Sequence, residues 1–320
     1  MDYFLEEDIV KKYLEIPSVE GLKLYHYTSP HTLWSIMQDP CLHFTNSKFF
    51  LDKSEIVYAY GVLKEAISKV GLNKEFKEVL LAFCEKHDLE KAFFEDDGPK
   101  REPTQYYVFS LSRKKDDLFM WNSYTKTENH HGYSLEIDIR KLLDSDLKFG
   151  ACMYGMVDYD RKSQVESFLK ILEDFDEEIS KLEKDQYYYQ KFYHVLNEFK
   201  DLFECKAALM KDDCFQAENE FRIILYSDET LDWFHSVNDS EIEEICGPVK
   251  LCYKESSGIL MPYMKVPIDL KNLVSIMPSP YMEHEQACEG LEHFAKTHSI
   301  EFKVESSRIP FLKRIMKEDT

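Results

Sequence analysis

The stretch YYVFSLS, residues 106–112, decides how we expect this chain to fold. Its tyrosine, valine and phenylalanine side chains suit a pleated strand, and its lack of charge predicts that the strand is buried. A second stretch, GYSLEIDI at residues 132–139, alternates Tyr133, Leu135 and Ile137 on one face, as strands do. Together the two stretches predict a central sheet.

Further strands are expected on both sides of this pair. KLYHYTS at residues 23–29 predicts an early strand, and the Ser29-Pro30 pair at its end favours the start of a short helix. Strands are predicted again after residue 218, in NEFRIILYS, VKLCYKE, ILMPYMKVPI and LVSIMPS. A last helix and strand are expected to close the fold.

A helical block separates these two sets of strands. No glycine occurs between Gly155 and Gly247, and apolar residues recur there at alternating spacings of three and four. This rhythm predicts two long helices, which we interpret as a helical hairpin inserted at residues 161–206. Strands before and after a helical block, without regular alternation, predict a single α+β domain over residues 1–320, with mixed or antiparallel central sheets.

The composition narrows the classes of partner. With 60 acidic and 40 basic residues, the 320-residue chain has a formal net charge of -20, which disfavours binding to anionic membranes and binding to nucleic acid through a broad basic surface. A local basic groove stays open as an alternative. No apolar run approaches the roughly 18 residues of a spanning helix. The acidic start, MDYFLEEDIV, does not resemble a signal peptide, so we expect a cytoplasmic protein.

The sequence offers no metal or nucleotide-loop motif. Its eight cysteines form no C-x-x-C pair, so a zinc ribbon is not supported and the thiols are expected to be free. The adjacent histidines of ENHHGY point in different directions, and we interpret them as part of a turn. No phosphate-binding loop or dinucleotide fingerprint occurs either.

Charged residues cluster in QAENEFRI, residues 216–223. As a strand, this stretch would place Glu218, Glu220 and Arg222 on one face. One interpretation is a solvent-facing strand with an ion pair that contributes little stability. The other is a carboxylate held on a rigid strand, where it can accept a hydrogen bond or stabilise positive charge.

Two other sites leave alternatives open. His26 is either a half-buried, hydrogen-bonded strand residue or a ligand-facing residue beside a helix N-terminus. In FMWNSY, residues 119–124, we expect Met120 and Trp121 to pack in the core, whereas the hydroxyl of Tyr124 could reach a cleft.

Taken in order, several of these motifs resemble an uncharacterised bacterial family, domain-of-unknown-function family 2971. The motifs are LYHYTS, LDKSE, YYVFSLS followed by FMWNSY and HGYSLEID, and ENEFRI, and they span about residues 22–280. The match has departures. LDKSE keeps Asp52 and Glu55 but lacks the family's asparagine and proline, Val108 stands where a cysteine is usual, and Phe215 stands where a tryptophan is common.

A more distant resemblance is to ADP-ribosyltransferases, most closely to the bacterial toxins that modify DNA. It rests on an early strand with a histidine, a middle strand with serines, and a late strand carrying Glu-Phe. This resemblance implies an ADP-ribosyltransferase-like fold and an enzyme that transfers ADP-ribose from NAD, without a metal, to an unknown protein or nucleic-acid target. A toxin, phage-defence or regulatory role is expected with it.

The same resemblance implies roles for single residues. Glu220 would stabilise the oxocarbenium-like transition state, because a fixed carboxylate near the positive charge on the ribose lowers the barrier. Glu218 would orient the target nucleophile. The residues implied in NAD binding are His26 on the nicotinamide-side ribose, together with Thr28, Ser110, Trp121, Tyr124 and Arg222.

Two other hypotheses compete with the enzyme. The chain could be a non-catalytic module of the same fold that binds a nucleotide or a protein. The helical hairpin could also form a homo-oligomer or dock a partner.

Overall fold

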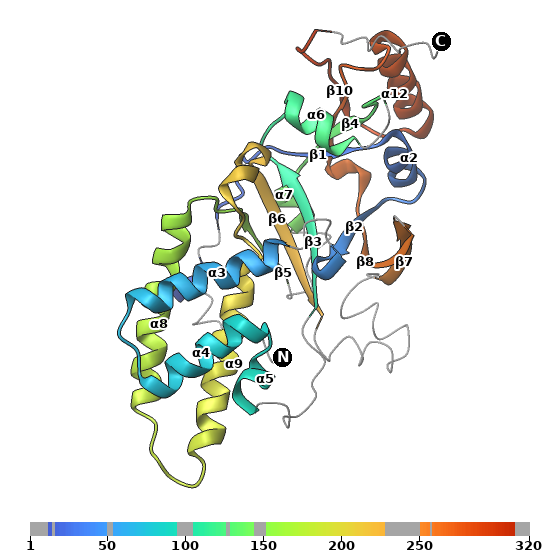
Figure 1. The fold of residues 1–320 in the computed structure, drawn as a ribbon. Helices are drawn as coiled ribbons and strands as arrows, with labels where there is room; N and C mark the ends of the chain where they lie inside the picture. The colour runs from blue at the N-terminus through green and yellow to red at the C-terminus, as the bar shows by residue number, and fades with distance from the viewer. Residues whose placement is uncertain are drawn as a thin grey trace, which may run out of the picture.

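The computed structural model describes residues 12–14, 17–49, 54–94, 105–125, 129–143, 152–227, 250–256 and 258–310. Within these ranges, ten strands join in one mixed, open sheet, and helices gather on both of its sides (Figure 1). The strands are β1 (Leu24–Thr28), β2 (Cys41–Asn46), β3 (Gln105–Ser112), β4 (Tyr133–Ile137), β5 (Cys152–Met156), β6 (Glu220–Ser227), β7 (Lys250–Ser256), β8 (Ile259–Pro267), β9 (Leu273–Pro278) and β10 (Lys303–Val304).

The helices fall into two groups. At one end of the molecule lie α3 (Ser54–Lys69), α4 (Lys74–Lys86), α5 (Leu89–Phe94), α8 (Arg161–Ser180) and α9 (Tyr188–Ala207). Toward the other end lie α2 (Pro30–Gln38), α6 (Leu118–Tyr124) and α12 (His284–His298). The short elements are α7 (Ile139–Lys141) and the 3-10 helices η1 (Ser47–Phe49), η3 (Asp213–Glu218) and η4 (Leu270–Asn272).

Strand β3, which contains the uncharged stretch 106–112, pairs with three other strands. The main path runs β10-β9-β4-β1-β3-β2-β8-β7, and β3 also pairs with β6, which in turn pairs with β5. Every pairing is antiparallel except that of β10 with β9. The sheet is therefore mixed, as the sequence predicts.

Two strands share one edge of β3. Because β6 pairs with β3 from Gln105 to Ser112, it occupies the other edge along the whole length. On the shared edge, β1 pairs near Ser112 and β2 pairs at Val108 and Tyr107. Strands β1 and β2, which α2 connects, therefore pair with opposite ends of the same edge.

The start of α2 follows the sequence signal. Ser29 has an extended backbone and its Oγ accepts a hydrogen bond from the Thr32 backbone N–H at 3.1 Å, while Pro30 occupies the first helical position. The predicted Ser-Pro helix start is confirmed. Asp52 of the LDKSE motif lies outside the described residues, and the side chain of Glu55 is not described.

The first group of helices, α3, α4, α5, α8 and α9, packs on one face of the sheet, and we call it the helical group. The aromatic residues Phe168, Phe199 and Phe203 of α8 and α9 share a buried cluster with residues of α3 and α4, and with Val108 and Ile224 from the sheet. The predicted rhythm therefore corresponds to two helices of 20 residues each. These helices share their core with helices from an earlier part of the chain.

The opposite face of β3 and β6 packs under α2. Phe109, Phe221 and Ile223 belong to a second cluster that includes Leu33 and Ile36 of α2. Since side chains alternate along a strand, odd-numbered residues of β3 and β6 face this cluster and even-numbered residues face the other way. This alternation decides where the predicted site residues lie.

Candidate functional site

A buried group of charged residues lies on the even-numbered face of β3 and β6. It consists of Lys211, Glu218, Glu220 and Arg222, each at most 6% exposed. Glu220 and Arg222 belong to β6, Glu218 is the last residue of η3, and Lys211 lies between α9 and η3. We call these four residues the charged network.

Within the network, Arg222 engages Glu220 through two parallel hydrogen bonds. Its Nε lies 3.0 Å from Oε1 of Glu220, and one terminal nitrogen lies 2.9 Å from Oε2. The other terminal nitrogen donates to the backbone carbonyl of Ala208 at 2.9 Å. Such two-point pairing is among the strongest ionic contacts in proteins. The bond from Arg222 to Ala208 joins β6 to the residue that follows α9.

Lys211 bridges the two glutamates. Its Nζ lies 2.6 Å from Oε2 of Glu218 and 3.6 Å from Oε2 of Glu220. The other oxygen of Glu218 accepts a hydrogen bond from the hydroxyl of Tyr124 on α6. Two carboxylates thus face two cations, so the network carries no net charge. A buried ion group is tolerated when its charges are paired in this way.

The backbone places Glu218 beside the strand and not within it. The sequence prediction that Glu218, Glu220 and Arg222 share a strand face is wrong for Glu218, because Asn219 adopts the left-handed conformation (φ 45°) and ends η3. Asparagine tolerates this conformation better than most residues. Ser112 Oγ donates to the Glu218 carbonyl at 2.6 Å, which fixes the turn against β3. The interpretation as a solvent-facing strand is also wrong, because all three side chains are buried.

The network keeps Glu220 ionised. Burial alone would raise the pKa of Glu220, but Arg222, Lys211 and a hydrogen bond from the Ser110 side chain outweigh it and hold the pKa below its usual range. Ser110 lies opposite Arg222 in the β3–β6 pairing, and this position brings the Ser110 side chain close to Glu220. Among the residues that sequence analysis proposed, Ser110, Tyr124, Glu218, Glu220 and Arg222 therefore meet in one place.

His26 lies on the other face of the sheet. Tyr25 is the partner of Ser112, and Ser112 is the partner of Glu220, so Tyr25 shares a face with Glu220 and its neighbour His26 does not. The His26 ring stacks near Phe109, with 4.7 Å between centroids, on the odd-numbered face. Thr28 follows His26 by two residues and shares its side of β1.

His26 bonds to the shared edge of β3. Its Nδ1 lies 3.3 Å from the carbonyl oxygen of Ser110, so this nitrogen carries the donated proton. Burial lowers the pKa of His26 to about 4, while the Ser110 carbonyl opposes this change. The ring is therefore neutral near pH 7. Of the two alternatives for His26, the structure favours the hydrogen-bonded strand residue.

Trp121 is a core residue, as expected from its type. It is fully buried, packs edge-on against Tyr27 with ring centroids 4.7 Å apart, and donates from Nε1 to Asp116 at 2.8 Å. Its neighbour on α6, Tyr124, is the residue that reaches the charged network. The side chain of Tyr124 therefore contacts a predicted site residue, Glu218, whereas the described contacts of Trp121 are with Tyr27 and Asp116.

Two members of this site, Lys211 and Tyr159, were not predicted from the sequence. The Tyr159 hydroxyl accepts a hydrogen bond from the Glu220 backbone N–H at 3.1 Å. No periodic pattern marks either residue, because both lie in irregular segments at the ends of the helical hairpin. One signal in the sequence indicates a further cation. The motif supplies two acids but a single cation, Arg222, and two buried acids require a second cation to pair with them.

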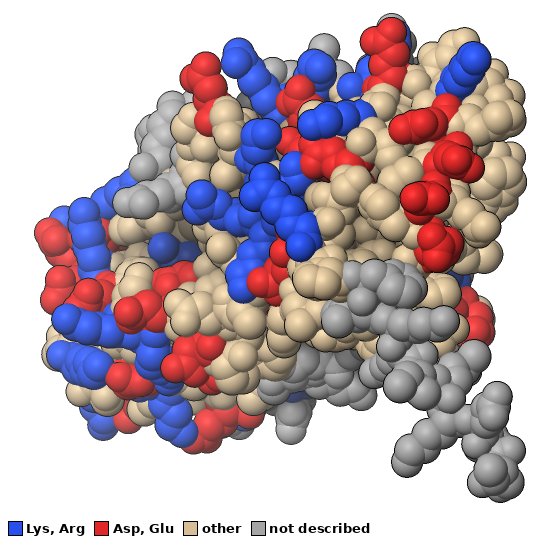
Figure 2. All heavy atoms as spheres, turned by 90° about the horizontal axis from the view of Figure 1, so that it is seen from above, with Lys and Arg blue, Asp and Glu red and all other residues tan. Residues whose placement is uncertain are grey.

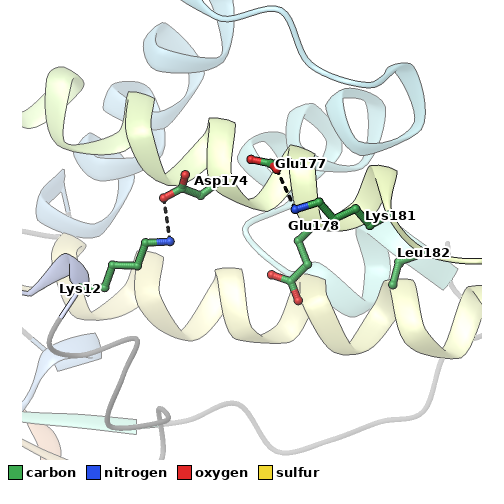
Figure 3. Close-up of a pocket in the computed structure, with 6 residues that line it drawn as sticks. All are labelled: Lys12, Asp174, Glu177, Glu178, Lys181 and Leu182. Atoms are coloured by element: carbon green, nitrogen blue, oxygen red, sulfur yellow. Dashed lines mark ion pairs between the residues drawn. The ribbon is translucent and has the colours of Figure 1, made fainter.

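A hollow in the helical group is separate from this site. Figure 3 shows it between α8 and the N-terminal residues, with Lys12 paired to Asp174 at 3.0 Å and Lys181 paired to Glu177 at 2.7 Å. Among the described residues that line it, Leu182 is the one apolar side chain. None of the predicted site residues lines this hollow. Its paired, exposed charges do not resemble a dinucleotide cleft.

Two general findings concern metals and membranes. In the described ranges, no three or more His, Cys, Asp or Glu side chains are grouped so that they could hold a metal ion. Over the same part of the chain, no helix has the length and apolar character needed to cross a bilayer.

The comparison with protein families gives one result. Residues 120–223 match the family model DUF2971, described as a protein of unknown function. This range starts at α6 and ends within β6, so it contains Tyr124 and the complete charged network. The DUF2971 match supports the first resemblance over these residues. No curated protein and no solved structure matches the chain, and the resemblance to ADP-ribosyltransferases has no support from these comparisons.

Proposed function

We propose that this chain is a non-catalytic binding module that keeps the strand plan expected of an ADP-ribosyltransferase-like fold, and that its ligand is a nucleotide. The plan is supported by the adjacency of β1, β3 and β6, the strands that carry His26, Ser110 and Glu220. The single observation that favours binding over catalysis is the two-point pairing of Glu220 with Arg222.

The physical argument concerns available charge. A carboxylate stabilises an oxocarbenium-like ribose only if its negative charge is directed at the ribose. In this chain both oxygens of Glu220 are bound to Arg222, and Oε2 also lies 3.6 Å from Lys211. Two cations therefore cancel most of the potential that the reaction would use. The position of His26 on the other face removes the partner expected on the ribose.

Calorimetric titration of the full chain with NAD and with ADP-ribose tests this proposal. We expect both compounds to bind, and we expect no nicotinamide to be released during incubation with NAD. The absence of binding heat for both compounds would overturn the nucleotide assignment. Release of nicotinamide that depends on Glu220 would overturn the non-catalytic assignment.

A second candidate, the transferase itself, is favoured by one observation: Glu220 is held ionised in a buried position and is hydrogen-bonded by Ser110. In that reaction the bond between the ribose C1′ and the nicotinamide nitrogen breaks, and its electron pair leaves with nicotinamide. The nucleophile of the target forms the new bond to C1′ and loses its proton.

The E220Q variant tests this candidate through NAD cleavage in the presence of protein and nucleic-acid targets. The expected result for a transferase is a fall of roughly a hundredfold or more. E136Q is the matched control, since Glu136 is also a buried acid but contacts Ser275 and Lys23 on another part of the sheet. Because E220Q leaves Arg222 without its partner, the double variant E220Q/R222M, which is also neutral, shows whether lost activity reflects lost folding.

A further inference from the structure

A basic surface lies at the end of β3, outside the charged network. Arg113, Lys114 and Lys115 follow β3 directly in the chain, and Lys303 and Arg308 come from the C-terminal part of the described chain. We call these five residues the basic surface. Both segments are in contact, because Lys115 and Lys303 each pair with Glu305.

A second contact holds the segments together. The carboxylate of Asp116 accepts hydrogen bonds from Ser307 Oγ at 2.9 Å and from the Arg308 backbone N–H at 2.7 Å. The same carboxylate also accepts from Trp121 Nε1, a buried core residue. The basic surface is therefore built on a fixed backbone.

The view of this end of the molecule shows a concentration of positive charge. In Figure 2, Lys and Arg side chains gather near the middle of the face, with some acidic side chains against the group and others toward the margins. The loop between β3 and α6 lies at the end of Figure 1 from which this view is taken. For a chain with a net charge of -20, such a concentration is unexpected.

Exposure adds to the positive character of the basic surface. The side chains of Lys303 and Lys115 are 74% and 39% exposed, whereas their shared partner Glu305 is 14% exposed. Lys114 is 33% exposed and pairs with Asp117 at 3.2 Å. Arg113 and Arg308 are exposed as well. An approaching anion would therefore meet the cations before the carboxylate.

Two exposed apolar side chains follow the basic segment 113–115 closely in the chain. Leu118 and Phe119, in the first turn of α6, are 43% and 41% exposed. Proteins that bind single-stranded nucleic acid combine cations that contact the phosphates with exposed aromatic rings on which bases stack. A duplex does not offer its base faces to such a ring.

We propose that the basic surface, together with Phe119, binds single-stranded nucleic acid through its phosphates and one stacked base. The inference does not depend on the proposed nucleotide-binding function, because it uses different side chains. It assigns to this surface the local basic site that the overall charge of the chain left open.

Fluorescence anisotropy with a labelled oligothymidylate tests the inference on the full chain. The variant R113A/R308A removes two exposed cations and leaves the contacts of Asp116 in place, so it is expected to fold. Loss of two phosphate contacts reduces the slope of log affinity against log salt by about 1.4. F119A is expected to weaken binding roughly tenfold, with little change in the salt slope, because stacking is not ionic.

The control variant K74A/K162A removes two exposed lysines from the helical group and so changes the net charge equally. We expect it to leave affinity within about twofold of the parent, since long-range screening weakens distant charges. The inference is overturned if the parent chain does not bind, or if the control loses as much affinity as R113A/R308A. Equal affinity for duplex DNA or for polyglutamate would also overturn it.

Discussion

Two groups of acids in this chain, one buried and one partly buried, differ in the cations beside them. In the charged network, Glu218 and Glu220 face Lys211 and Arg222, and the pKa of Glu220 is lowered. On α9, Asp201 and Glu204 both lie near Lys200, at 3.6 Å and 3.8 Å, and Glu204 also accepts a hydrogen bond from the Tyr106 hydroxyl.

The pKa values follow this difference. Burial raises the pKa of Asp201 to about 7, and it also raises the pKa of Glu204, with Lys200 opposing both changes. Desolvation is the largest cause in both groups, so the supply of paired cations decides whether a buried acid stays ionised. Glu220 is thus a strongly held anion, and Asp201 is an acid that titrates near neutral pH.

The largest effect is expected from R222M, which would make the charged network resemble the α9 group. Removing the arginine leaves Glu220 buried beside Lys211 alone, and breaking one partner of a buried ion pair costs about 3–5 kcal/mol. Denaturant unfolding at neutral pH measures the loss. The double variant E220Q/R222M is expected to recover much of it, because no unpaired charge is left. Equal losses in both variants would show that the arginine acts through packing and not through charge.

An intermediate effect is expected from D201N. The folded chain holds the Asp201 proton more tightly than the unfolded chain does, so stability falls as pH rises from the unfolded pKa toward about 7, and it stays reduced above that. D201N is therefore expected to stabilise the fold at pH 8 by on the order of 1 kcal/mol, after allowance for partial exposure. Its control, E173Q, changes an exposed acid on α8 and should show little effect. If the free energy of unfolding of D201N depends on pH as it does in the parent chain, the raised pKa of Asp201 is contradicted.

The smallest effect is expected from H26F, which keeps a ring beside Phe109 but removes the donor to the Ser110 carbonyl. Loss of one hydrogen bond predicts a cost of about 1 kcal/mol at pH 7. The pKa of His26 is lowered, so the unfolded chain binds protons more readily and the native residue loses stability as pH falls from its unfolded value toward about 4. H26F should remove part of that decline. The exposed His194 supplies the control H194Q, which should keep the decline.

The strands and helices were predictable where local patterns decide them. The uncharged stretch at 106–112 indicates a strand buried on both faces, and the apolar rhythm of Phe168 and Phe199 indicates helices buried on one face; both signals depend on neighbours along the chain. The capping pair Ser29-Pro30 is equally local. These features needed no knowledge of the tertiary structure.

The candidate site was predictable in part. The E-x-E-x-R motif identified three members of the charged network, but it placed Glu218 on a strand because alternation cannot reveal the left-handed turn at Asn219. Lys211 joins through a segment that has no period. The face of His26 depends on the pairing of Tyr25 with Ser112, which is a property of sheet register and is not encoded in the motif itself.

The bond from Arg222 to the Ala208 carbonyl has a consequence for how the chain folds. It links β6 to the end of α9, while Val108 and Ile224 contribute to the core of the helical group. Excision of the hairpin would therefore expose apolar surface on α3 and on the sheet, and it would release the segment that holds Ala208, the acceptor of one Arg222 nitrogen. Helices and strands should melt together in one cooperative transition, and the hairpin should not behave as a detachable module.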